Sequence, residues 1–391
     1  MQKISNNNFV RRPVYYSMIL FFLVLMIPYV RRYILDMGYR WVLVLLLSFA
    51  VSFCLTPVFG WLAYRLNILD RPGSRKLHAT ATPLLGGAAV FAAFLTVILT
   101  NGIFSVKLWS ILGAAVLIFA VSLADDCREI SAGLKLLVQI FCSSFVICFG
   151  IVLKVVPENL GLIAQLSNIS LTLLWIIGIT NAMNFFDGMD GLAAGLSAII
   201  SLFLGWVAFQ TNQPLLGWIA VAMLGSCLGF LPYNFRKNGK AFIFLGDSGS
   251  TAIGFILACV AVYGDWAEAS PMVALASPLL IFWVLIFDMI HITVDRILTG
   301  KVLSLRQWIE YVGRDHLHHR IAYALGGQKK SVLFIYLMSF CLGASALLIR
   351  NAQFFDAILL LVQASIFVVL ITVLERRGRT LAMENGLKEP S

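Results

Sequence analysis

Charged residues are scarce in this chain, and their scarcity excludes most water-soluble folds. Only 12% of the 391 residues are charged, whereas about 25% is usual for a soluble globular domain. Hydrophobic residues make up 60% of the chain, and the mean hydropathy is +0.90. A chain with so few charges and so many apolar residues is typical of a protein that crosses the membrane many times.

Cysteine pairs, a signal-peptide cleavage site, internal repeats and low-complexity tracts are also lacking. The seven cysteines form no Cys-x-x-Cys pair and lie mostly in apolar runs, so we interpret them as small hydrophobic side chains without disulfides. No small-residue cleavage site cleanly follows the first apolar run, and we expect no cleaved signal peptide. We treat residues 1–374 as one membrane domain and expect the charged tail, 375–391, to be disordered.

Long apolar runs, by contrast, are abundant and predict the architecture. A transmembrane helix needs about 20 mostly apolar residues. We therefore predict an all-α, polytopic membrane helix bundle of about 11–12 transmembrane helices, from apolar runs near 13–30, 41–66, 84–103, 108–124, 134–157, 168–185, 190–209, 215–234, 248–264, 271–295, 331–349 and 354–374.

The basic residues predict how these spans are oriented. If the connections alternate between sides, 23 of the 29 Lys and Arg residues fall on one side, together with the chain ends. Basic residues are enriched in cytoplasmic loops, so we assign that side, including the C-terminus, to the cytoplasm. Arg31, Arg32 and Arg40 are exceptions; if 13–30 does not span, only the N-terminus changes sides. This sidedness accounts for the net charge of +10 without nucleic-acid binding.

Nearly all the unusual polar clusters fall on the cytoplasmic side, at helix ends and in loops. A transporter keeps its polar residues near the bilayer midplane, on broken helices. A site that faces one compartment at the lipid boundary suits an enzyme joining a water-soluble substrate to a lipid. A secondary transporter or lipid flippase remains the alternative from another class.

The most unusual stretch is NAMNFFDGMDGL, residues 181–192, directly after an apolar run. Polar groups next to hydrocarbon are costly and usually mark function. Asn184, Asp187 and Asp190 are three residues apart, roughly on one helix face. The structural alternative is a turn whose Asn and Asp side chains cap the next helix.

Four further clusters have a chemical and a structural interpretation each. The basic residues of the first cytoplasmic loop, 70–87, could contact anionic phosphate, although they also fit the positive-inside pattern. The adjacent pair Asp125 and Asp126 suits a general base or a shared Mg²⁺, with Lys135 nearby, or simply a capped helix end. Asp247, in a glycine-flanked helix start, favours phosphate bridged by a cation or acts as an N-cap. The histidines of the last loop suit phosphate, with zinc as an alternative, whereas Asp288 and His291 could form a buried pair.

These clusters together resemble the polyprenyl-phosphate N-acetylhexosamine-1-phosphate transferase family (glycosyltransferase family 4). The motifs DRPGSRKLH, DD followed by Lys135 and Gln139, NAMNFFDGMDGL, GDSGS and DHLHHR occur in the family's order between Asp70 and Arg320. The RKLH and HLHH segments resemble the undecaprenyl-phosphate N-acetylglucosaminyl-1-phosphate transferase branch more than the muramoyl-pentapeptide branch.

The resemblance implies a helix bundle with a cleft open to the cytoplasm, a family-like core at about 41–350, and a groove for the polyprenyl chain. It implies that undecaprenyl phosphate displaces UMP from a UDP-sugar, which starts lipid-linked glycan synthesis at the bacterial inner membrane. It also implies Mg²⁺, with Mn²⁺ as the alternative, and leaves a homodimer open. UDP-N-acetylmuramoyl-pentapeptide or another UDP-N-acetylhexosamine stays open as the donor.

The resemblance assigns roles to fifteen residues of this chain, grouped by what each group would contact. Asp247 and Asn184 would hold the metal, and Asp125 or Asp126 would be the base or orient the lipid phosphate. Lys135 would contact phosphate, and Asp187 and Asp190 would line the nucleotide side. The remaining group would bind substrate: Arg75, Lys76, His78, Asn181, His316, His318, His319 and Arg320.

Overall fold

The computed structural model describes residues 12–71, 81–236, 239–266, 271–302, 304, 307, 313, 316–349 and 354–384. Over these ranges nearly all the regular structure is helical. The only pairing between strands there is a two-residue ladder, β1 (Leu69–Asp70) with β2 (Thr82–Pro83). The all-α prediction is therefore confirmed.

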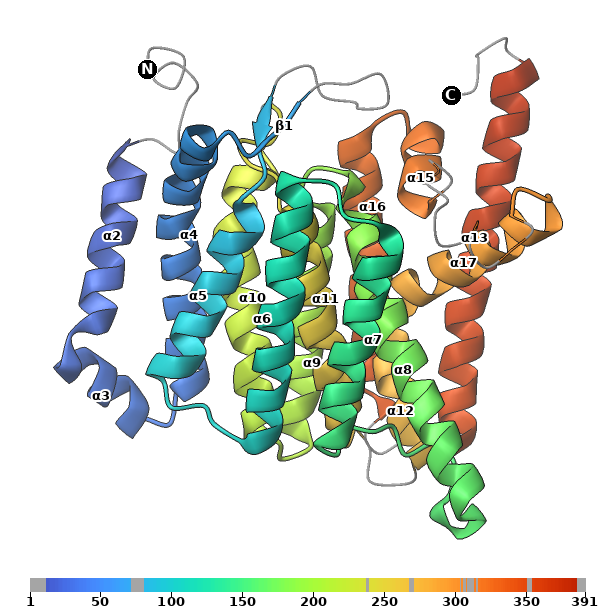
Figure 1. Cartoon of the computed structure of the whole chain (residues 1–391), viewed down its shortest axis with the longest axis horizontal. Coiled ribbons are helices and arrows are strands. Elements are labelled where there is room, and N and C mark those ends of the chain that lie inside the picture. Colours follow the sequence, from blue (N-terminus) through green and yellow to red (C-terminus); the bar gives the residue numbers. More distant parts are fainter. Residues whose placement is uncertain are drawn as a thin grey trace.

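The helices stand side by side and run alternately up and down through one bundle (Figure 1). Two short 3₁₀ turns, η1 (Glu158–Leu160) and η2 (Phe186–Gly188), lie at either end of α8. The helices are α2 (Arg12–Met26), α3 (Pro28–Asp36), α4 (Arg40–Leu66), α5 (Gly86–Thr100), α6 (Val106–Cys127), α7 (Ala132–Cys148), α8 (Leu162–Phe185), α9 (Leu192–Gln210), α10 (Pro214–Asn234), α11 (Gly246–Tyr263), α12 (Pro271–Ile281), α13 (Trp283–Leu298), α15 (Leu317–Leu325), α16 (Gln328–Ala346) and α17 (Phe354–Glu384).

Every predicted apolar run corresponds to helix in the structure. Among the described residues, seven helices are long and apolar enough to cross a membrane, or up to nine if each bent pair is one span. The bent pairs are α2 with α3, at 68°, and the end of α12 with α13, at 75°. Shorter apolar helices occupy the other three runs, in α5, α7 and α17. The chain is thus a multi-pass membrane protein.

Helix α11 lies at the centre of the bundle, and glycines let α5 approach it closely. The 18 residues of α11 are 89% buried inside the bundle. A Cβ on Gly87 would lie 2.3 Å from the Cα of Gly249, so no larger side chain fits at this crossing. The amides of Gly86 and Gly87 also donate to the carbonyls of Phe244 and Leu245, at 3.0 and 2.7 Å. The close packing of Gly86 and Gly87 against the start of α11 thus fixes where this helix begins.

Two of the three basic residues that depart from the charge pattern contact the C-terminal end of α5. Arg31 of α3 donates to the carbonyl of Thr100 and to Oδ1 of Asn101, and Arg40 donates to the carbonyl of Asn101. The C-terminal carbonyls of a helix carry partial negative charge and lack intrahelical partners. Arg31 and Arg40 therefore cap α5, and the Arg40 guanidinium also stacks over Trp218 at 4.0 Å.

Candidate active site

Two segments far apart in the sequence meet where Asp126, at the end of α6, caps the start of α11. The Oδ1 and Oδ2 atoms of Asp126 accept the amides of Asp247 and Ser248 at 3.0 and 3.1 Å. The first amides of a helix have no intrahelical acceptor, so a carboxylate there is stabilised by both hydrogen bonds and the helix dipole. Gly246 has φ +77°, and a Cβ there would meet Asp126 Oδ2 at 2.9 Å. Asp126 thereby fixes the position of Asp247.

Lys135, in the first turn of α7, joins the carboxylates of two other helices. Its ammonium donates to Asp125 of α6 and lies 3.3 Å from Oδ2 of Asp247 in α11. Asp125 also accepts the amide of Ile130 at 2.7 Å. Lys135 and Asp125 are largely buried, so their charges are poorly screened by water. The predicted grouping of Asp125, Asp126, Lys135 and Asp247 is therefore a physical cluster.

Asn181 and Asp187, on α8 and the η2 turn, border this cluster in different ways. Asn181 exchanges two side-chain hydrogen bonds with Gln139 of α7, at 2.7 and 3.2 Å, and donates a third to Ile177. Its amide group is thus occupied by protein partners. Asp187 receives a hydrogen bond from the backbone of Gly246 and is within electrostatic reach of Asp126 and Asp247.

Asp190 lies at the far end of the same turn and holds a loop. Its Oδ2 accepts the amide of Ala241 at 2.9 Å. Asn234, at the end of α10, supports the same region: its side chain accepts from the Gly191 amide at 2.7 Å and donates to the Ile243 carbonyl at 2.9 Å. These contacts join the NAMNFFDGMDGL segment to the loop that precedes Asp247. The sequence gives no signal for the role of Asn234 beyond its position at the end of an apolar run.

The histidines of the last loop pack directly on the same segment. The rings of His316 and Phe185 are stacked at 4.9 Å, and those of His318 and Phe186 lie 5.4 Å apart. A Cβ on Gly188 would approach Nε2 of His318 to 2.9 Å. Glycine at position 188 therefore leaves the room that His318 occupies, and two motifs about 130 residues apart in sequence form one wall.

His318 is buried at the N-terminus of α15 and is uncharged. Only 1% of its surface is exposed, and within the described part of the chain neither ring nitrogen has a hydrogen-bond partner. Burial and the neighbouring His319 and His316 hold the pKa of His318 well below its usual range. A neutral imidazole with two unused nitrogens at a helix N-terminus suits a polar or anionic ligand.

Asp288 corrects one prediction from the sequence. The sequence suggests a buried pair of Asp288 with His291, one helical turn away. Instead, the carboxylate accepts from Nδ1 of His316 at 2.8 Å and from the Leu317 amide at 2.7 Å. Side chains three residues apart on α13 need not pair when a loop supplies better donors. In the sequence, the sign that Asp288 has a function is its position as a carboxylate within an apolar helix.

The acidic residues fit a divalent cation in charge and donor type. Among the described residues, the carboxylates of Asp125, Asp126, Asp187 and Asp247 interact electrostatically near the ammonium of Lys135. Mg²⁺ prefers oxygen ligands and tolerates few protein ligands. Asn184 is half-buried one turn before Gly188. Among the described residues no three His, Cys, Asp or Glu side chains form a metal-holding group, and this holds for the acidic residues as well as for the histidines.

The predicted residues Arg75, Lys76 and His78 lie outside the described residues. The remaining predicted residues lie in α6, α7, α8, η2, α11 and α15, except Asp190, which lies between η2 and α9, and His316, which precedes α15. The ends of these elements that carry the residues lie at one end of the bundle (Figure 1). The prediction that clusters scattered over two-thirds of the chain serve one site is consistent with this placement.

Known proteins resemble the chain over most of its length. Residues 108–265 match the family model of Glycosyl transferase family 4. A Bacillus subtilis protein named probable undecaprenyl-phosphate N-acetylglucosaminyl 1-phosphate transferase is 31% identical over 85% of this chain and 91% of its own. A Mycobacterium leprae decaprenyl-phosphate N-acetylglucosaminephosphotransferase is 33% identical over 73% and 78%. A Prochlorococcus marinus phospho-N-acetylmuramoyl-pentapeptide-transferase is 30% identical over 62% and 73%.

Proposed function

Because this chain belongs to glycosyl transferase family 4, we propose that it transfers N-acetylglucosamine 1-phosphate from UDP-N-acetylglucosamine to undecaprenyl phosphate. A phosphate oxygen of the lipid attacks the β-phosphorus of the nucleotide sugar. The bond from that phosphorus to the bridging oxygen breaks, and UMP leaves. The observation that carries this proposal is the cluster of Asp125, Lys135 and Asp247, which forms where the end of α6 meets the first turns of α7 and α11. Because the members of this family are transferases, the chain is an enzyme, and the transporter alternative is dropped.

The work of these residues is electrostatic and positional. Transfer of a phosphoryl group between two anions requires charge neutralisation and in-line placement more than covalent help. Lys135 offsets negative charge at the site, while Asp126 holds the start of α11 and with it Asp247. Asp125 orients Lys135. Both oxygens of each of the two adjacent carboxylates already accept hydrogen bonds, so Asp125 and Asp126 are alternative candidates for accepting a proton or orienting the lipid phosphate.

Mg²⁺, with Mn²⁺ as the alternative, would be held by Asp247 and Asn184 and would neutralise the diphosphate when bound. The excess of carboxylates over ammonium groups supports this assignment. Asp187 completes the acidic side of the site, and Asp190 supports it through the loop that it holds. Asn181 acts through Gln139 by fixing α8 against α7.

The basic groups would bind the donor substrate. His316, His318 and His319 with Arg320 lie at the N-terminus of α15, where the helix dipole favours anions. We assign them to the diphosphate or the sugar. Arg75, Lys76 and His78 of the first loop would contact phosphate as well.

The donor sugar follows from the relatives that align over most of both chains. Two of them are named for N-acetylglucosamine, whereas the muramoyl-pentapeptide relative aligns over 62% of this chain. N-acetylglucosamine is therefore the preferred sugar, and UDP-N-acetylmuramoyl-pentapeptide or another UDP-N-acetylhexosamine is the alternative. The product would start a lipid-linked glycan of the cell envelope, such as O-antigen or cell-wall polysaccharide. The basic side would face the cytoplasm of a bacterial inner membrane, with the C-terminus on that side.

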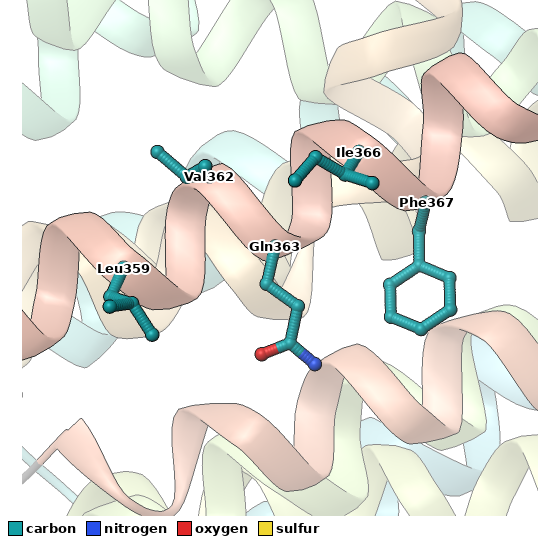
Figure 2. A pocket seen from close by; sticks show the side chains of 5 residues that line it. All are labelled: Leu359, Val362, Gln363, Ile366 and Phe367. Atoms are coloured by element: carbon teal, nitrogen blue, oxygen red, sulfur yellow. The ribbon is translucent and has the colours of Figure 1, made fainter.

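A homodimer along α17 completes the proposal. Leu359, Val362, Gln363, Ile366 and Phe367 line a groove of about 430 Å³ on one face of this helix, into which the Gln363 amide extends (Figure 2). Gln363 is exposed and makes no hydrogen bond within the described part of the chain. An amide in hydrocarbon needs a polar partner. The same amide of a second copy offers both donor and acceptor, so two α17 helices would pair about a two-fold axis.

The reaction is tested with purified protein, undecaprenyl phosphate, Mg²⁺ and labelled UDP-sugars. We expect label from UDP-N-acetylglucosamine in the lipid fraction and an equal amount of UMP. Asp247→Asn should abolish this metal-dependent UMP release without loss of the folded protein, because one metal-binding oxygen is lost. Transfer of another labelled sugar would replace the donor assignment. Near-normal activity of the Asn variant would overturn the metal assignment.

A further inference from the structure

A buried carboxylate in a broken membrane helix holds the histidine loop. Asp288 of α13 is 0% exposed. Its two oxygens are used by residues of the last loop: Oδ2 faces Nδ1 of His316 at 2.8 Å, and Oδ1 accepts the Leu317 amide at 2.7 Å. Removal of a carboxylate from water is unfavourable unless its partners compensate. The partners here belong entirely to the turn that begins α15.

These contacts leave one polar atom on the His316 ring. Because a carboxylate can only accept, Nδ1 carries the hydrogen and Nε2 is the atom with a free lone pair or, in the imidazolium, a second N–H. Phe185 stacks against the ring at 4.9 Å and 29°, and the His318 ring is stacked at 5.8 Å and 18°. The ring is thus held by hydrogen bonding and by aromatic packing, and only 7% of its side chain is exposed.

We propose that Asp288 is a positioning residue that fixes the tautomer and direction of His316, so that the bare Nε2 accepts a hydrogen bond from the substrate sugar. The proposal rests on the proposed function, since it names how that site binds its substrate. Phe185, against which His316 stacks, follows Asn184 directly and precedes Asp187 by two residues. The ring therefore lies beside the acidic cluster where the phosphates would react. Second-layer carboxylates commonly orient histidines in this way.

The decisive variant is Asp288→Asn, which keeps the side-chain volume but replaces one acceptor oxygen with a donor NH₂ group. The Asn oxygen can still accept the Leu317 amide, but its NH₂ group donates toward Nδ1 of His316. Nδ1 must then be bare, and the proton moves to Nε2. We expect kcat to fall about 10²-fold with the KM for the UDP-sugar nearly unchanged, because the rest of the site still binds the substrate but Nε2 now donates where it should accept a hydrogen bond. Asp288→Glu, which keeps the carboxylate, should recover part of this loss.

The matched control is Asp295→Asn, on the same helix two turns later. Asp295 is 39% exposed and lies 4.0 Å from Lys301, so the same chemical change there should leave kcat and KM unaltered. A second control is the His316→Gln background. If Asp288 acts through His316, adding Asp288→Asn to it should not lower activity further. A further large loss in the double variant would show that Asp288 acts elsewhere and would overturn the proposal.

A measurement that does not depend on enzyme activity tests this proposal separately from the proposed function. In ¹⁵N-histidine-labelled protein, one of the five histidines should give the Nδ1–H pattern, disappear in His316→Gln, and change tautomer in Asp288→Asn. If the wild type releases no UMP yet shows this pattern, the proposed function fails and the tautomer assignment stands. If UMP is released but the pattern is unaffected by Asp288→Asn, the positioning role fails alone.

Discussion

At the scale of single residues, the two adjacent carboxylates of α6 differ in what surrounds them. Asp126 accepts two helix amides, whereas Asp125 accepts one amide and the ammonium of Lys135. A carboxylate that caps a helix loses that cap when it is replaced, so activity loss on substitution of Asp126 would include a positional effect on Asp247. Sequence alone presents them as an equivalent pair.

Gly188 provides a sharp test of how the two motifs fit together. Gly188→Ala places a methyl group 2.9 Å from Nε2 of His318, and His318 is too buried to move aside. We expect activity to fall about 10²-fold and the free energy of unfolding to fall by about 1–3 kcal/mol. Initial rates of UMP release and thermal denaturation in detergent would measure these effects.

The control for this substitution lies on the adjoining helix, α8. A Cβ on Gly178 would meet nothing within 4 Å, so Gly178→Ala should leave activity unchanged and, because alanine favours helix, should not reduce stability. Equal losses in both variants would mean that the helix backbone, and not the His318 contact, needs glycine.

At the scale of elements, helix ends rather than helix faces form the site. Asp126 links α6 to α11, Lys135 links α7 to both, and Asp288 links α13 to α15. Each link joins a charged side chain to the free amides or the charges at another helix end. Displacement of one helix end should therefore affect several site residues at once.

Helix α17 carries the prediction for assembly. Gln363→Leu removes the amide from the lipid-facing groove, so two copies lose the interhelical hydrogen bonds that bring them together. We expect the variant to be monomeric in mild detergent by light scattering, with activity per chain retained. Ser365→Ala is the control, because Ser365 is exposed on the same helix and, in the part of the chain that the structure describes, bonds only the Leu361 carbonyl. If the Gln363→Leu variant is still a dimer, the Gln363 amides do not hold the two copies together, and lipid would then fill the groove.

At the scale of the whole molecule, the sequence predicts the bundle better than the contacts within it. Apolar runs report burial in lipid directly, so every predicted span has its helix. The motifs also predict that their residues belong to one site, and those that the structure describes lie at one end of the bundle. Hydrogen-bond partners are different: Asp288 bonds His316 because α13 and the last loop happen to meet, and Asp126 caps α11 because Gly87 packs on Gly249. Both outcomes depend on tertiary packing that no local pattern encodes.

The orientation of the molecule can be measured with its own cysteines. Cys127, at the end of α6 that carries the site, and Cys148, at the far end of α7, are both exposed. In single-cysteine variants, a maleimide that cannot cross membranes should label Cys127 only in inside-out vesicles and Cys148 only in right-side-out vesicles. The opposite labelling would place the site outside the cytoplasm.

The arginine caps on α5 have a consequence for biogenesis. Arg31 and Arg40 are made early in translation, but their acceptors at Thr100 and Asn101 are made about 60 to 70 residues later. Until those carbonyls reach the far side of the membrane, the two guanidiniums have no helix end to neutralise. Helices α3 and α4 therefore leave the ribosome before the helix that supplies these contacts, and the order of synthesis is not the order of assembly.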